Sequence, residues 1–179
     1  MSKILMSNGE YYDYSQPWES EYDVLTVAQA LSNICRFNGH TREFYSVAQH
    51  CVEMSNLVPP NYALAALMHD AHEAFVGDVP TPLKRLLGQQ FADIDLLAQL
   101  NIATRFGIPY NSLTSKVIKN ADMIMLSTER RDLLPPHFND DVWPQLPQPI
   151  TSRIVPWDCR KANHEFIKRY ETLIDYNRH

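Results

Sequence analysis

Hydrophobic residues recur along most of the chain with the period of an α-helix. From residue 24 onward they fall at the i, i+3, i+4 and i+7 positions that share one helical face. This spacing predicts helices over residues 24–35, 43–57, 61–77, 90–105, 113–133 and 158–176. Gly39 is expected to end the first helix and Pro59-Pro60 the second, while Asn61 and Asp158 are N-cap candidates for the third and the last. The helix over residues 61–77 is apolar around most of its circumference, which is typical of a central buried helix.

Three segments depart from this helical pattern. Residues 4–12 resemble a small β-hairpin, because Asn8-Gly9 is a strong signal for a two-residue turn whose positions both need a positive φ. Residues 77–82 contain two prolines and are expected to form a turn. The six prolines between residues 135 and 156 predict a long irregular loop.

The pattern as a whole predicts one all-α domain over residues 1–179, a helical bundle with a small N-terminal β-hairpin. Its core is expected at about residues 24–135, followed by the Pro-rich loop at 135–157 and a C-terminal helix at 158–176. On that last helix Phe166, Tyr170 and Leu173 form an apolar face, which is assigned to the core in preference to a subunit contact.

Composition and charge exclude several classes of protein. Of the 179 residues, 45% are hydrophobic and 21% are charged, which is enough apolar material for a core without a disulfide or a structural metal. The formal net charge of −5 argues against a protein that coats nucleic acid or binds an anionic membrane. Three cysteines without a CxxC pair are typical of a reduced, intracellular protein. There is no signal-peptide pattern and no apolar run near the ~18 residues of a membrane span, so we expect a cytoplasmic location, or the host cytoplasm for a phage-encoded chain.

The segment over residues 67–73 carries the most informative polar residues. His69 and Asp70 are adjacent in a helix that is otherwise rich in Ala, Leu and Met, and burying them there is costly without a partner such as a metal ion. At ~100° per residue, Glu73 lies only about 40° around the helix from His69 and about 60° from Asp70, so all three are expected to project into one sector. His50 and Asp122 are two further polar residues beside apolar helical neighbours.

Two histidines and two aspartates form a ligand set that suits Zn²⁺, Mn²⁺, Co²⁺ or Fe²⁺ and leaves positions open for water and substrate. Such a centre lowers the pKa of bound water toward ~7 and polarises a phosphoryl oxygen. In this interpretation Glu73 is placed to move the proton.

Each of these signals also has a plainer interpretation. A single His-Asp pair in a helix is common without a metal, and the two histidines at 69 and 72 lack the HExxH spacing of zinc proteases. His72 points about 60° away from His69, so it is expected to lie behind the ligands or to face solvent. Asp78 could simply cap a backbone amide in a turn. Residues 128–132 are most simply explained as a solvated helix face whose charges pair with one another.

Taken together, these motifs resemble the HD-domain metal-dependent phosphohydrolases over about residues 24–135. The resemblance is strongest for small helical members that act on deoxynucleotides, the bacterial 5′-deoxynucleotidases and the phage dATP triphosphohydrolases. The order of residues that carries it is Arg36, His50, His69-Asp70, Glu73, Asp78 and Asp122. The segments 36–41, 44–50, 77–84 and 128–132 are similar to a signature of this subgroup, and so is the leading hairpin.

The resemblance implies a metal centre formed by two histidines and two aspartates, namely His50, His69, Asp70 and Asp122. The ion would be a divalent transition metal (Zn²⁺, Co²⁺ or Mn²⁺), with Mg²⁺ arriving on a triphosphate. Glu73 would be the acid/base carboxylate, Asp78 would contact the sugar or the reacting water, and Arg36 would bind a phosphate.

The resemblance also implies contacts to the rest of the substrate. Phe37 and Pro82 would pack against adenine, and Lys84 would bind phosphate. Additional cations that are candidates for the β and γ phosphates are Lys119, Arg130 and Arg131. An ordinary surface lysine is an equal alternative for Lys119.

Hydrolysis of dATP at the α-phosphate to deoxyadenosine and triphosphate is the leading hypothesis that follows from the resemblance. A 5′-deoxynucleotidase acting on monophosphates is the second, and a non-catalytic nucleotide-binding module is the third. The expected partner is thus a small-molecule deoxynucleotide, with neither a nucleic-acid polymer nor a membrane. The resemblance further implies a homo-oligomer, either a dimer or a hexamer.

Overall fold

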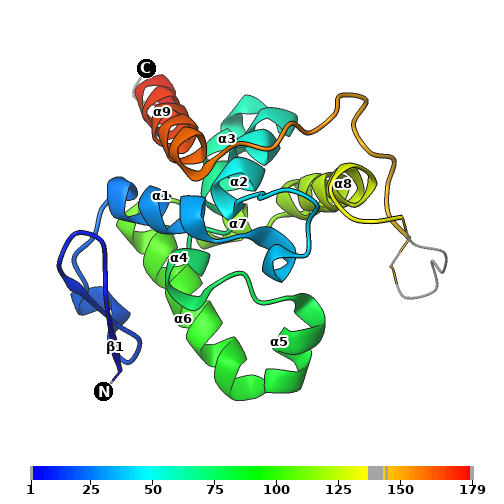
Figure 1. The fold of residues 1–179 in the computed structure, drawn as a ribbon. Coiled ribbons are helices and arrows are strands. Elements are labelled where there is room, and N and C mark those ends of the chain that lie inside the picture. Colours follow the sequence, from blue (N-terminus) through cyan, green and yellow to red (C-terminus); the bar gives the residue numbers. More distant parts are fainter. Residues whose placement is uncertain (1, 137–142, 144, 178–179) are drawn as a thin grey trace.

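The structure, a computed structural model, describes residues 2–136, 143 and 145–177. It is mostly helical with a two-stranded antiparallel hairpin at the N-terminus, which confirms the predicted fold class (Figure 1). The α-helices are α1 (Val24–Asn33), α2 (Val47–Leu57), α3 (Ala63–Met68), α4 (Glu73–Val76), α5 (Thr81–Leu87), α6 (Gln89–Arg105), α7 (Tyr110–Leu113), α8 (Lys116–Asp132) and α9 (Cys159–Asn177). Short 3₁₀ helices are η1 (Pro17–Glu19), η2 (Arg36–Gly39) and η3 (Pro60–Tyr62).

The hairpin forms where the sequence predicts it, but its turn is different. Strand β1 (Lys3–Leu5) pairs along its whole length with β2 (Tyr11–Asp13), so five residues connect the strands. Gly9 has a φ of 87°, whereas Asn8 does not have a positive φ. The N–H of Gly9 donates to the carbonyl of Met6 at 3.1 Å, which closes a wider turn than the predicted two-residue one. Only the glycine therefore needs the left-handed conformation.

The core lies where α2 packs against α1, α3 and α9 (Figure 1). The predicted central buried helix is confirmed for α3, in which Ala63 and the whole run over residues 65–68 are buried. The α9 side chains Phe166 and Leu173 are also buried, which confirms their assignment to the core. The hairpin is held against this body by Tyr12, whose ring stacks on Phe75 of α4 at 3.8 Å between centroids.

The boundary between the first two helices differs from the prediction. Helix α1 ends at Asn33 instead of continuing to residue 35, because Ile34 turns into an extended conformation and Cys35 forms a β-bridge with Ser46. Gly39 does not terminate this helix. Helix α2 begins at Val47 and not at residue 43, since the Ser46 side chain accepts from the backbone N–H three residues later, as an N-cap does.

The predicted continuous helix over residues 61–77 is interrupted. Residues 69–72 form a turn between α3 and α4. The backbone hydrogen bonds at this turn join an N–H to the carbonyl three residues earlier. The N–H of Glu73 donates to the carbonyl of Asp70 at 2.9 Å, a 3₁₀-type contact. Asn61 lies in η3 and makes no capping bond. The predicted end at Gly77 is confirmed, with a φ of 79° after the last residue of α4.

Helix α5 was not predicted, because the two prolines over residues 77–82 were interpreted as a turn only. Pro82 in fact occupies the first turn of α5, where its missing N–H costs nothing. The predicted helix over 113–133 is α8, which begins later, at Lys116, with Ser115 as its N-cap. The capping role of Asp158 is confirmed, since its Oδ1 accepts from the backbone N–H of Lys161 at 2.8 Å.

The Pro-rich segment is irregular in its described part, as predicted, while residues 137–142 and 144 lie outside the described residues. Gln49 of α2 holds its C-terminal end, because the side-chain amide donates to the carbonyl of Val155 at 2.9 Å and accepts from the N–H of Trp157 at 2.8 Å. Asp132 at the end of α8 accepts from the N–H of Ile154 at 3.0 Å. Among the described helices none is long and apolar enough to cross a bilayer.

We expect the Gln49→Ala substitution to destabilise the fold by about 1–3 kcal/mol, because it leaves buried polar groups without partners. Gln49 is fully buried and makes a third side-chain bond, to Glu53 at 2.7 Å. The free energy of unfolding can be measured by urea denaturation, with exposed Gln90→Ala on α6 as the control. Equal stability of the two variants would contradict the anchoring role.

Candidate metal centre

The predicted metal ligands come together from three elements. His50 is on α2, His69 and Asp70 follow directly after α3, and Asp122 is on α8. The Nε2 atom of His50 lies 3.4 Å from Oδ1 of Asp122 and 3.7 Å from Oδ2 of Asp70. The Nε2 atom of His69 lies 3.0 Å from the same oxygen of Asp70. Two donor atoms that each bind one ion at ~2.0–2.2 Å lie about 2.8–3.6 Å apart, so this spacing suits a shared ion.

The hydrogen bonds of the two imidazole rings also orient them as metal ligands. The Nδ1 atom of His50 is 2.6 Å from a carboxylate oxygen of Glu129, and Nδ1 of His69 is 2.8 Å from the carbonyl of Ala66. Both Nδ1 atoms therefore donate, which leaves the two Nε2 atoms as the ring nitrogens that an ion would bind in place of a proton. These Nε2 atoms are buried and have no hydrogen-bond partner among the described residues. An ion bound there would satisfy two otherwise orphaned nitrogens.

The cluster is buried on one side and open on the other. The side chains of His50 and His69 are only 0% and 8% exposed, whereas that of Asp122 is 43% exposed. The ligand atoms of His50, His69 and Asp122 all lie within 4.8 Å of one another. Water or a small substrate thus has access to the centre past Asp122.

Glu129 is a site residue that the sequence interpretation missed. Residues 128–132 were expected to form a solvated face, but Thr128 and Glu129 are fully buried. Besides its contact with His50, the Glu129 carboxylate accepts from the Arg36 guanidinium at 3.1 Å. Glu129 follows Asp122 by seven residues, two helical turns along α8, so helical periodicity would have placed both on one face.

Charge in the cluster is shared between buried groups. Burial and the charge of Arg36 lower the pKa of His50, but Glu129 and Asp122 outweigh them and raise it to about 9. Burial raises the pKa of Asp70, but His69, His50 and Arg36 together hold it well below its usual range. Arg36 lies 3.6 Å from Asp70, so its guanidinium links the carboxylates of Asp70 and Glu129.

Two further predicted residues, Glu73 and Asp78, are acids at the edge of the cluster. Glu73 is 4% exposed, and its Oε2 has no hydrogen-bond partner among the described residues. Burial and the charges of Asp70 and Asp78 raise the pKa of Glu73 well above its usual range. Burial also raises the pKa of Asp78, partly offset by Arg36. Burial and the neighbouring carboxylates thus favour the protonated form of Glu73 compared with an exposed glutamate.

The residues predicted to contact the substrate differ in their surroundings. The guanidinium carbon of Arg36 lies 5.5 Å from the centroid of the Phe37 ring. The backbone of Phe37 is in the left-handed conformation, with a φ of 54°. Lys84 is paired with Asp95 at 3.4 Å, Pro82 is exposed on α5, and Lys119 is exposed at the start of α8.

His72 is not solvent-facing. It is 4% exposed, and its Nε2 lies 3.3 Å from Oδ1 of Asp95, the same oxygen that pairs with Lys84. Asp95 of α6 therefore ties the turn after α3 to α5.

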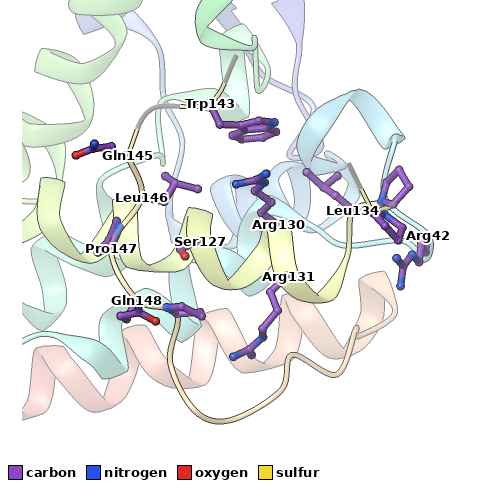
Figure 2. Close-up of a pocket in the computed structure, with 13 residues that line it drawn as sticks. Arg42, Ser127, Arg130, Arg131, Leu134, Trp143, Gln145, Leu146, Pro147 and Gln148 are labelled. Atoms are coloured by element: carbon purple, nitrogen blue, oxygen red, sulfur yellow. The ribbon is translucent and has the colours of Figure 1, made fainter. Parts of the chain in front are cut away.

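A pocket of about 580 Å³ lies on another face of α8, against the Pro-rich segment (Figure 2). Arg130 points toward Trp143 there, with 5.1 Å between the guanidinium carbon and the ring centroid. Arg131 points away and donates to Asp132 and to the carbonyls of Ile150 and Ser152. None of the predicted metal ligands lines this pocket, so it is separate from the cluster.

Comparisons with known proteins give relatives of similar length. The chain is 40% identical over 177 residues to the uncharacterized protein YfdR of Escherichia coli strain K12, covering 97% of this chain and 96% of that protein. It is 29% identical over 139 residues to an uncharacterized protein of Rhodobacter capsulatus, covering 72% and 71% of the two chains. No protein-family model matches the chain.

We expect Glu129→Gln to weaken binding of Zn²⁺ about 10–100-fold, because the neutral amide stabilises the His50 N–H and the buried Arg36 charge less than a carboxylate does. Affinity can be measured by competition with a chromophoric chelator. The exposed Glu43→Gln variant is the control, and His50→Ala gives the value for a lost ligand. Unchanged affinity in Glu129→Gln would show that this carboxylate only supports the fold.

Proposed function

This chain belongs to the same family as Escherichia coli YfdR, and we propose that it is an HD-domain phosphohydrolase that uses a divalent metal ion to hydrolyse deoxynucleotides at the α-phosphate. The proposed reaction converts dATP to deoxyadenosine and triphosphate. The observation that carries the proposal is the pair of buried imidazoles whose Nε2 atoms face two carboxylates, with the buried carboxyl of Glu73 at the edge of the same group.

The ligand set of the proposal is His50, His69, Asp70 and Asp122. When bound, a divalent transition metal supplies Lewis acidity that polarises a phosphoryl oxygen and acidifies water. The proposed ion is Zn²⁺, Co²⁺ or Mn²⁺, all of which accept imidazole and carboxylate ligands. A triphosphate would bring Mg²⁺ with it.

The chain's own residues would provide orientation and proton transfer. Arg36 lies over Asp70 and would bind a phosphate oxygen while it neutralises the buried carboxylates. Glu73 would give its proton to the O5′ leaving oxygen when the bond between phosphorus and O5′ breaks. Asp78, on the connection after α4, would contact the sugar or the attacking water.

A 5′-deoxynucleotidase is the second candidate, and one observation favours it. Binding of a triphosphate needs cations beyond Arg36, yet Lys84 is paired with Asp95 and Arg131 with Asp132. Lys119 is exposed, and Arg130 lies over Trp143 in the separate pocket. A monophosphate would require fewer cations. A homo-oligomer, dimer or hexamer, is part of the proposal in either case, as is a cytoplasmic location.

Product analysis separates these candidates. We expect incubation with Co²⁺ or Mn²⁺ plus Mg²⁺ to convert dATP to deoxyadenosine and intact triphosphate, since attack at the α-phosphorus releases both products. Chromatography would follow dATP, dGTP, dCTP, dTTP, ATP and dAMP in parallel. Turnover of dAMP alone would make the protein a 5′-deoxynucleotidase, and no turnover of any substrate would leave only a nucleotide-binding module.

Replacement of the proposed acid gives a sharper test of mechanism. We expect Glu73→Gln to lower kcat by about 10²–10⁴-fold, because the amide cannot donate a proton at neutral pH. Metal content, measured by inductively coupled plasma mass spectrometry, should stay at the wild-type level. Glu171→Gln on the exposed face of α9 is the matched control. Wild-type turnover by Glu73→Gln would remove Glu73 from the mechanism.

A further inference from the structure

A buried cysteine adjoins the candidate metal centre. Cys51 follows His50 directly on α2 and is fully buried. We propose that the Cys51 thiolate is a further ligand of this centre and makes it selective for Zn²⁺ and Co²⁺ over Mg²⁺ and Mn²⁺. The proposal rests on the metal centre of the proposed function, but it does not depend on which nucleotide is hydrolysed.

The position of the sulfur carries the first part of the argument. The Sγ atom of Cys51, a ring nitrogen of His69 and a carboxylate oxygen of Asp70 all lie within 4.8 Å of one another. A sulfur at ~2.3 Å and a nitrogen at ~2.05 Å from one tetrahedral ion are about 3.5 Å apart. The upper limit of 4.8 Å in the observed group is therefore within about 1.3 Å of the spacing in a ligand set.

The ring of His69 supplies the second, independent observation. Its side chain is 8% exposed, and Nδ1 is held by the carbonyl of Ala66 at 2.8 Å. Its Nε2 has no hydrogen-bond partner among the described residues. His69 belongs to two potential ligand groups, one with His50 and Asp122 and the other with Cys51 and Asp70. The His69 ring therefore adjoins the sulfur of Cys51 as well as the carboxylates, and its Nε2 lies 3.0 Å from Oδ2 of Asp70.

The chemical type of the donor atoms determines which metal ions the centre prefers. Imidazole and carboxylate donors accept Mn²⁺ as well as Zn²⁺ and Co²⁺, although Mn²⁺ binds more weakly, and a thiolate ligand widens this preference for the softer ions. Ligation requires the Cys51 thiol to release its proton to solvent as the sulfur–metal bond forms, with no change in oxidation state. The alternative is a thiol that only packs behind the His69 ring, which would leave the selectivity of the centre unchanged.

Titration of the metal-free full-length protein with Co²⁺ tests the proposal directly. Visible d–d bands report that the ion is bound, and a near-ultraviolet sulfur-to-cobalt charge-transfer band reports a thiolate ligand. We expect both sets of bands in the wild type and loss of the charge-transfer band in Cys51→Ala and Cys51→Ser. The ratio of Zn²⁺ to Mn²⁺ affinity should fall about 10–100-fold in these variants.

The other two cysteines provide matched controls. Cys35→Ser and Cys159→Ser replace partly exposed thiols outside the ligand groups, so both should keep the charge-transfer band and the affinity ratio. Visible bands without a charge-transfer band in the wild type would overturn the role of Cys51 while the metal centre stands. Persistence of the band in Cys51→Ala would overturn it too. Absence of all cobalt bands would instead refute the metal centre and the proposed function with it.

Discussion

The buried carboxylate of Glu129 is the interaction on which the candidate centre depends. It accepts from Nδ1 of His50 and from Arg36, and so it joins α8 to α2 and to η2. Each of these charged groups would be costly in the interior without the others, since removal of one partner from a buried ion pair costs ~3–5 kcal/mol. The same contact fixes the tautomer of His50 and turns its Nε2 toward the other ligands. Stability and ligand orientation therefore have one cause.

The interruption between α3 and α4 places the proposed acid. In a continuous α-helix Glu73 would share a sector with both His69 and Asp70. In the structure the N–H of Glu73 bonds to the carbonyl of Asp70, and a 3₁₀ turn stacks residues that are three apart. The carboxyl of Glu73 is accordingly close enough to Asp70 for that charge to raise its pKa. A local change of helix type thus keeps the Glu73 carboxyl near the ligand Asp70.

Around the centre, most positive charge is already engaged. Lys84 and His72 converge on Asp95, and Arg131 is held by Asp132 and two backbone carbonyls. These contacts fix α5 against α6 and the Pro-rich segment against α8. Two of the predicted phosphate ligands, Lys84 and Arg131, therefore have structural partners, so a substrate would have to compete with Asp95 for Lys84.

The sequence by itself determined the helical class, the hairpin, several helices and the residue types of the ligand set, because periodicity, caps and prolines act over a few neighbouring positions. It could not determine that residues 128–132 are partly buried, since a charged helix face looks the same whether water or another helix covers it. Glu129 contacts His50 and Arg36 across 79 and 93 residues of chain. Only the packing of α8 against α2 decides that contact, and with it the orientation of the ligands.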